Sequence, residues 1–121
     1  MSEAKHLYAI HCVDDQSCGR ADGEPRGGSK KRMDNYSAHK EYQLATANPE
    51  DPRYINKICA GPMVEEDAKY MVGSFFLVEG TREEVQKFVD DDPFNKASVW
   101  QAKSIERYIA VNGVKTHGGN L

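Results

Sequence analysis

Residues 73–100 read GSFFLVEGTREEVQKFVDDDPFNKASVW, and this stretch predicts a strand, a helix and a returning strand in succession. The run at 71–78, MVGSFFLV, is dense in aromatic and branched side chains and is closed by Gly80, which is typical of a strand covered on both faces. Thr81 and Glu84 have the spacing of a capping box, in which two side chains satisfy free amides at a helix start. A helix is therefore expected directly after Thr81.

The predicted helix has one apolar stripe and a sharp end. Its apolar residues follow helical spacing and leave the opposite face charged; they are Val85, Phe88 and Val89. The helix is expected to stop by Asp92, because Pro93 disfavours helical angles in the residue before it. The carboxylates at 90–92 then gather at a helix C-terminus, where the helix dipole disfavours negative charge. Of these, Asp92 is the one expected to turn inward, towards a cation or a histidine.

Length and charge restrict the class of protein. A chain of 121 residues is long enough for one domain with its own core and too short for two ordinary ones, so a single domain over 1–121 is expected. A net charge of −3 gives no electrostatic reason to expect nucleic acid as a partner. The N-terminus lacks a signal-peptide pattern and no apolar run is long enough to cross a membrane, which predicts a cytoplasmic protein.

The N-terminal part of the chain predicts a strand followed by a long loop. Residues 6–13, HLYAIHCV, are apolar on both faces of such a strand, and His11 on one of them is either a packed core residue or part of a pocket wall. Residues 14–28 are rich in Gly, Asp, Pro and Ser and predict an extended loop, of a length common for lids or mobile segments. Bases outnumber acids by five to two over 19–32. This rim either steers an anionic small molecule or is a solvated surface.

The remaining elements complete an α+β fold. Ser29 is a suitable N-cap for a helix over 30–47, and further strands are expected at 54–63 and 98–111. With the central stretch, the order becomes strand, helix, strand, strand, helix, strand, which is the ferredoxin-like βαββαβ arrangement with a four-stranded antiparallel sheet. Two helices cover only one face of such a sheet, so strands that are apolar on both faces require a second cover. We expect a homodimer joined through sheet faces, with the tail at 112–121 resting on the partner.

Several motifs in this order resemble the YCII-related (YciI-like) domain family. The stretch 73–100 matches the family's Gly-Ser strand, helix, Asp-Pro-aromatic turn and Val-Trp strand. The motifs that match the family's first helix and second strand are Arg32-Met33, His39, Tyr42 and Gly61-Pro62. The likeness covers most of 7–108 and implies a dimeric α+β barrel.

The resemblance also implies a dyad of His39 and Asp92. Members of the family carry a histidine on the first helix and an aspartate at the Asp-Pro-aromatic turn, and these positions are His39 and Asp92 in this chain. A carboxylate bonded to an imidazole fixes its tautomer and suits it to act as a general base. The alternative is a structural His–Asp bond that ties two helices together.

Four further residues are predicted to contact a substrate. Ser74 matches the family's strand serine and either orients a substrate oxygen or is structural, and Arg32 either neutralises a carboxylate or lies on the surface. Tyr36 stands where relatives often have arginine, which puts the usual anion contact in doubt and offers a hydroxyl and a ring instead. The fourth candidate is His11, as a pocket-wall residue.

No metal or cofactor is predicted. The four histidines lack paired ligand spacing, and the three cysteines are odd in number and lack a Cys-x-x-Cys motif. No glycine-rich phosphate loop follows a strand.

The resemblance implies a cofactor-independent lyase or isomerase that moves a proton on a small polar or aromatic-derived anionic compound. Relatives eliminate chloride from hydroxylated aromatics or resemble muconolactone isomerases. The alternative is a non-catalytic ligand-binding or accessory module with the same pocket.

Overall fold

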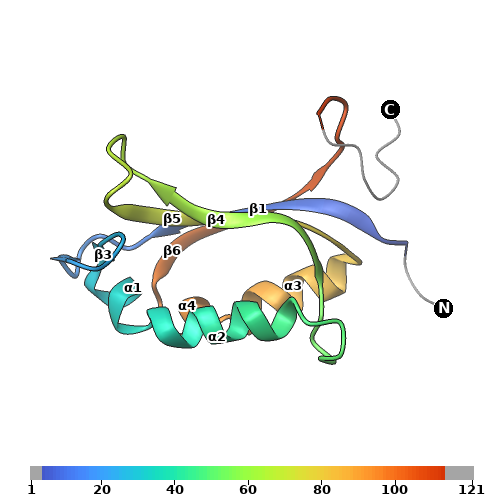
Figure 1. Cartoon of the computed structure of the whole chain (residues 1–121). Helices are drawn as coiled ribbons and strands as arrows, with labels where there is room; N and C mark the ends of the chain where they lie inside the picture. Colours follow the sequence, from blue (N-terminus) through green and yellow to red (C-terminus); the bar gives the residue numbers. More distant parts are fainter. Residues whose placement is uncertain (1–3, 114–121) are drawn as a thin grey trace.

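The computed structural model describes residues 4–113, which form a four-stranded antiparallel sheet with all the helices against one face (Figure 1). The strands of this sheet are β1 (His6–Asp14), β4 (Asn56–Val64), β5 (Met71–Gly80) and β6 (Trp100–Tyr108). The helices are α1 (Lys30–Asp34), α2 (Tyr36–Thr46), α3 (Arg82–Asp90) and α4 (Pro93–Lys96). A small second sheet pairs β2 (Arg20–Ala21) with β3 (Gly28–Ser29).

The order of strands across the main sheet is β4-β5-β1-β6, and every neighbouring pair is antiparallel. The helical connection from β1 to β4 passes over β5, and the one from β5 to β6 passes over β1. This arrangement confirms the predicted ferredoxin-like α+β fold. Because both crossovers lie on the same side of the sheet, the helices and the sheet enclose the core between them (Figure 1).

Helix α3 begins at the predicted capping box. The hydroxyl of Thr81 accepts a hydrogen bond from the Glu84 amide at 3.1 Å, and the Glu84 carboxylate accepts one from the Thr81 amide at 2.9 Å. The apolar stripe of the helix is buried in the core, as its spacing predicts. The helix ends at Asp90, before the proline at Pro93.

The core lies on the helix-facing side of the sheet. Along β1, alternate side chains point into it; these are Tyr8, Ile10 and Cys12. They meet Phe76 and Val78 from β5. Cys12 is fully buried, and burial together with the nearby charge of Asp92 raises the pKa of its thiol to about 12.

The opposite face of the sheet has no helix over it in residues 4–113, and we call it the open face. It exposes large apolar side chains from three different strands, because Val13, Met63 and Tyr108 are 37%, 41% and 43% exposed. His11 is also exposed on this face, between the buried Ile10 and Cys12. The interpretation of His11 as a packed core residue is therefore wrong for the single chain, because its side chain alternates away from the helices.

Two predicted segments are more divided than expected. The helix expected over 30–47 is broken at Asn35, whose side-chain amide donates to the Lys31 carbonyl at 2.8 Å and which separates α1 from α2. The segment 14–28 contains strand β2 and the first residue of strand β3, which pairs with β2. Arg20 in β2 also forms an ion pair with Glu65, with a nitrogen-to-oxygen distance of 2.9 Å. A charged contact to the β4–β5 hairpin thus holds part of the segment predicted to be a loop.

The last strand is shorter than predicted, and the described part of the chain ends soon after it. Strand β6 covers Trp100–Tyr108 rather than 98–111. Most of the tail predicted to rest on a partner subunit lies outside the described residues. Within residues 4–113, no helix has the length and hydropathy needed to cross a membrane.

Candidate active site

His39 and Asp92 form a buried pair beneath the sheet. The distance from Nδ1 of His39 to Oδ1 of Asp92 is 2.8 Å. The residues are 8% and 1% exposed, so water competes little for this bond. His39 comes from the middle of α2 and Asp92 from the turn between α3 and α4, as the family resemblance implies for the two positions.

Asp92 lies at the N-terminus of helix α4. It is the N-cap of α4, with Pro93 in the first helical position, and its Oδ1 accepts a hydrogen bond from the Phe94 amide at 2.9 Å. A carboxylate is favoured at a helix N-terminus. The prediction that Asp92 lies at an unfavourable helix C-terminus is therefore wrong, because a new four-residue helix begins beside it.

Gln43 holds the second carboxylate oxygen. Its side-chain amide donates to Oδ2 of Asp92 at 2.8 Å. Gln43 follows His39 by one helical turn, so both side chains reach Asp92 from the same face of α2. The Asp92 carboxylate thus accepts three hydrogen bonds, from His39, Gln43 and the Phe94 amide.

The imidazole of His39 is fixed in its tautomer and its plane. Asp92 is an acceptor, so Nδ1 carries the donated proton and the lone pair is on Nε2. The ring lies flat on Phe94, with centroids 3.8 Å apart and planes at 3°. The ring of Trp100 contacts the imidazole edge-on, with the two centroids 6.4 Å apart. Within residues 4–113, Nε2 makes no hydrogen bond, which leaves it available to a ligand.

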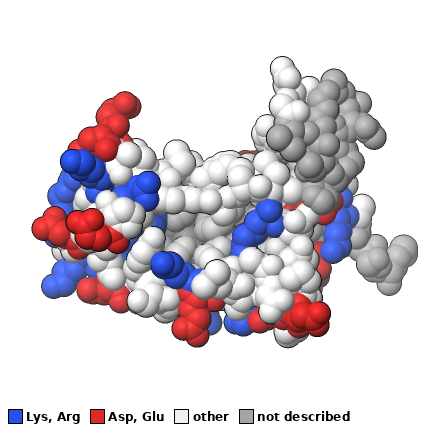
Figure 2. Space-filling view, viewed as in Figure 1, with Lys and Arg blue, Asp and Glu red and all other residues white. Residues whose placement is uncertain are grey.

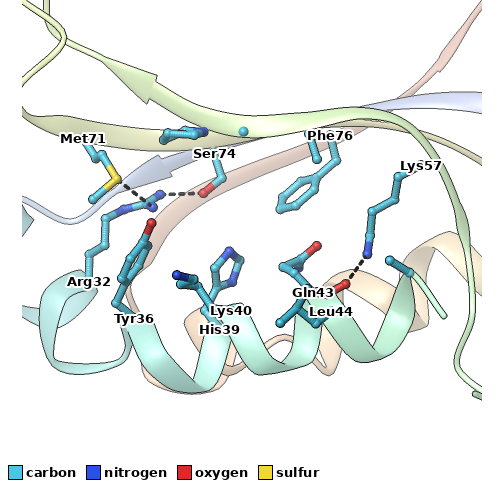
Figure 3. Close-up of a pocket in the computed structure, with 14 residues that line it drawn as sticks. Arg32, Tyr36, His39, Lys40, Gln43, Leu44, Lys57, Met71, Ser74 and Phe76 are labelled. Atoms are coloured by element: carbon cyan, nitrogen blue, oxygen red, sulfur yellow. Dashed lines mark hydrogen bonds between the residues drawn. The ribbon is translucent and has the colours of Figure 1, made fainter. Parts of the chain in front are cut away.

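A cavity of about 310 Å³ lies between α2 and the strands β4 and β5, and His39 forms part of its wall (Figure 3). This volume is at the small end of the range for ligand sites. The polar and aromatic side chains that line it are Arg32, Tyr36, His39, Lys40, Gln43, Lys57, Ser74 and Phe76. In the part of the chain that the structure describes, no carboxylate side chain lines it. Figure 2 shows a largely uncharged surface between the sheet and α2, with basic groups nearby and acidic groups towards the periphery.

Arg32 lies at one end of the cavity and is already paired. Its Nε donates to Oδ2 of Asp14 at 2.7 Å, and its Nη2 donates to the Ser74 hydroxyl at 2.5 Å. Arg32 and Asp14 are 2% and 0% exposed. Burial raises the pKa of the Asp14 carboxyl, and the hydrogen bond from Arg32 opposes that rise. The alternative that placed Arg32 on the surface is wrong, and its charge is largely neutralised before any ligand arrives.

The structure brings together all but one of the six predicted site residues. Ser74 and Tyr36 both line the cavity. The rings of Tyr36 and Phe94 are stacked, with their centroids 6.5 Å apart. His11 does not line it, because β1 turns this side chain to the open face. Within residues 4–113 His11 is therefore not part of this cavity, and its assignment to a substrate site stays a prediction.

Sequence reasoning missed three residues of the site. Gln43 had a usable signal, its position one turn after His39. Asp14, at the end of β1, and Lys57, on β4, had none, because their contacts join segments far apart in the chain. In the described residues, no cluster of three or more histidine, cysteine or acidic side chains could hold a metal ion.

Comparison with known proteins gives a relative among solved structures. The chain matches no protein-family model and no curated protein, so the name YCII-related stays a prediction. It is 30% identical to the 5-chloro-2-hydroxyhydroquinone dehydrochlorinase TftG of Burkholderia phenoliruptrix, solved in complex with 2,5-dihydroxybenzoquinone. The match covers 84% of this chain and 92% of that one, with a TM-score of 0.62. The chain therefore belongs to the same family as this dehydrochlorinase.

Proposed function

We propose that this protein is a cofactor-independent lyase that eliminates an acid, such as hydrogen chloride, from a hydroxylated aromatic compound. The observation that carries the proposal is the available Nε2 of His39, which lies in the wall of the cavity and whose ring is bonded to a buried carboxylate. An imidazole held in this way has the geometry of a general base. The relative's dehydrochlorination of a chlorinated hydroquinone supplies the reaction class.

In this mechanism His39 accepts a proton from the substrate through Nε2. The electron pair of the broken bond moves into the ring system, and the leaving group departs with its own bonding pair. The sum is loss of one proton and one anion, so the step needs neither oxidant nor reductant. Asp92 stabilises the positive charge that develops on the imidazole, because its Oδ1 already accepts the hydrogen bond from Nδ1–H.

The walls of the cavity suit a single flat ring. Phe76 and Met71 supply apolar contacts on the sheet side, and Tyr36 supplies a ring and a hydroxyl on the helix side (Figure 3). A cavity of about 310 Å³ has room for one substituted ring and little more. A small hydroxylated aromatic compound is therefore the substrate class that fits best.

Chloride release from 5-chloro-2-hydroxyhydroquinone tests the proposal directly. Wild-type protein should release chloride in proportion to enzyme concentration, and His39→Ala should lower the rate by about 10²–10⁴-fold, as for the loss of a general base. An equal rate in His39→Ala would remove the mechanism. If the protein binds halogenated or otherwise substituted hydroxyquinols but turns over none of them, that result would favour the alternative, a non-catalytic binding module.

We further propose that a second copy of the chain covers the open face. Support comes from the apolar side chains that three strands expose there, among them Val13, Met63 and Tyr108. Exposed apolar patches of this kind mark interaction sites. The cavity lies on the helix side of the sheet, so such an interface would not fill it.

A further inference from the structure

Lys57 lies at the end of the cavity opposite Arg32 (Figure 3). It projects from β4 and is half-buried, and its ammonium donates to the Gln43 carbonyl and to the Thr46 hydroxyl, both at 2.8 Å. An ammonium has three N–H groups, so one donor remains after these two bonds. His39 lies between the two basic residues in the row of side chains that Figure 3 shows.

The charge of Lys57 has no counter-ion in the described structure. Both of its hydrogen-bond acceptors are neutral, and no carboxylate within residues 4–113 forms an ion pair with it. Burial lowers the pKa of its ammonium to about 8, a shift that the charge of Asp92 only partly opposes. Arg32 at the other end differs, because Asp14 already neutralises it. The ammonium also lies over the ring of Phe88, with Nζ 5.4 Å from the ring centroid, but that contact supplies no opposite charge. Partly buried charges are normally paired with an opposite charge, so the arrangement indicates a missing anion.

A purely structural role for Lys57 explains less of this arrangement. The Gln43 carbonyl already accepts a hydrogen bond from the Ala47 amide at 3.2 Å, and the Thr46 hydroxyl already donates to the Tyr42 carbonyl at 2.9 Å. The last turn of α2 therefore has its hydrogen bonds without the lysine. A neutral donor would serve that turn equally well at lower desolvation cost.

We propose that Lys57 forms an anion subsite that binds an ionised ring oxygen of the ligand, at the far end of the cavity from Arg32. The subsite rests on the proposed function, since it assigns the orientation of a hydroxylated aromatic or quinone-type ring in that same cavity. One oxygen substituent lies against Lys57, and the reacting part of the ring lies beside Nε2 of His39. The absence of any carboxylate among the described lining residues agrees with an anionic ligand.

Calorimetric titration at neutral pH with two probes tests the subsite. The first probe is 2,5-dihydroxybenzoquinone, whose hydroxyls are acidic and ionised at this pH, and the second is hydroquinone, which is neutral. Lys57→Met should weaken binding of the ionised probe at least tenfold and should change binding of hydroquinone less than twofold. Lys57→Arg, which keeps the charge, should retain most of the affinity for the ionised probe.

Lys69→Met is the matched control, because Lys69 is an exposed lysine that does not line the cavity. It should change affinity for either probe less than twofold. An affinity of Lys57→Met within twofold of wild type would overturn the subsite, as would an equal loss for both probes, which indicates a structural effect. Failure of the wild type to bind the ionised probe would overturn it as well.

The outcome is separable from that of the proposed function. If Lys57→Met selectively loses the ionised probe while wild-type protein releases no chloride, the anion subsite stands and the lyase proposal falls. If wild-type protein releases chloride and Lys57→Met has unchanged affinity and KM, the lyase proposal stands and the subsite falls.

Discussion

Oδ1 of Asp92 accepts hydrogen bonds from Nδ1 of His39 at 2.8 Å and from the Phe94 amide at 2.9 Å, so one oxygen orients the imidazole and starts helix α4. The carboxylate could not rotate away from His39 without uncapping the helix. The orientation of the His39 imidazole is therefore enforced by backbone structure, in addition to the side chains around it.

Asp92→Asn should lower kcat by at least 10²-fold and leave KM within a few-fold of wild type. The amide has one acceptor oxygen in place of two, so it cannot serve His39, Gln43 and the Phe94 amide together, and one buried donor loses its partner. The free energy of unfolding should fall by about 1–3 kcal/mol. Steady-state kinetics and urea unfolding measure both effects, and the control is Asp90→Asn at an exposed position of the same acidic run.

Gln43→Ala should lower kcat about tenfold, which is less than the loss in Asp92→Asn, because Asp92 keeps two of its three hydrogen bonds. The measurement is chloride release under saturating substrate. Glu41→Ala is the control, since Glu41 is an exposed residue of α2 that does not line the cavity. An unchanged kcat in Gln43→Ala would show that the hydrogen bond from Gln43 to Oδ2 of Asp92 does not contribute to turnover.

Arg32→Met should destabilise the protein by about 3–5 kcal/mol, because it leaves the buried Asp14 without its partner. Adding Asp14→Asn to this variant should recover part of the loss, since the uncompensated charge is then removed as well. Urea unfolding of the two single variants and the double variant forms a cycle that isolates the pair. Simple additivity of the two single losses would contradict the pairing argument.

The stability of the protein should depend on pH through Lys57. Its pKa falls from 10.5 in the unfolded chain to about 8 in the folded one, so between these two values the unfolded chain holds a proton that the folded chain has lost. Stability then rises with pH across this window. Relative to Lys57→Met, the wild type should gain about 1 kcal/mol after allowance for solvent screening.

Urea unfolding of both proteins at the two ends of that window measures the gain. The other charged groups at the cavity, Arg32, His39 and Lys40, are common to both proteins, as is Asp92, so their titrations cancel in the difference. A difference that stays constant with pH would mean that the lysine titrates at its ordinary value.

Sedimentation equilibrium should give the mass of a dimer for the wild type. Met63→Lys places a charge on the open face, where Met63 is 41% exposed, and should shift the equilibrium towards monomer. Leu44→Lys, on the helix side, should leave the dimer intact. A wild-type monomer at micromolar concentration would contradict the proposed interface.

The fold could be predicted from local signals because those signals agree with one another. The capping box at Thr81, the apolar stripe of α3 and Pro93 each act within a few residues, and the structure keeps all of them. The break at Asn35 escaped prediction because the segment has helical composition on both sides and no proline or glycine. The face to which His11 points was missed because the strand is apolar enough in both directions to permit either assignment.

The candidate site was predictable only where the family resemblance pointed to it. His39 and Asp92 are 53 residues apart, and no local pattern brings them together. The support around them depends on contacts across the fold, such as Lys57 to α2 and Arg32 to Asp14. Such contacts follow from strand register, and the register of β4 shifts after Lys57, which sequence periodicity does not reveal.

The burial of Cys12 has a consequence for the proposed chemistry of quinone-type rings. Such rings are electrophiles that alkylate thiolates, and self-inactivation is the hazard of releasing one beside a reactive cysteine. None of the chain's three cysteines lines the cavity, and a thiol with its pKa raised to about 12 stays protonated at neutral pH. An electrophilic product of the proposed reaction would therefore form next to His39 with no cysteine thiol in the cavity wall.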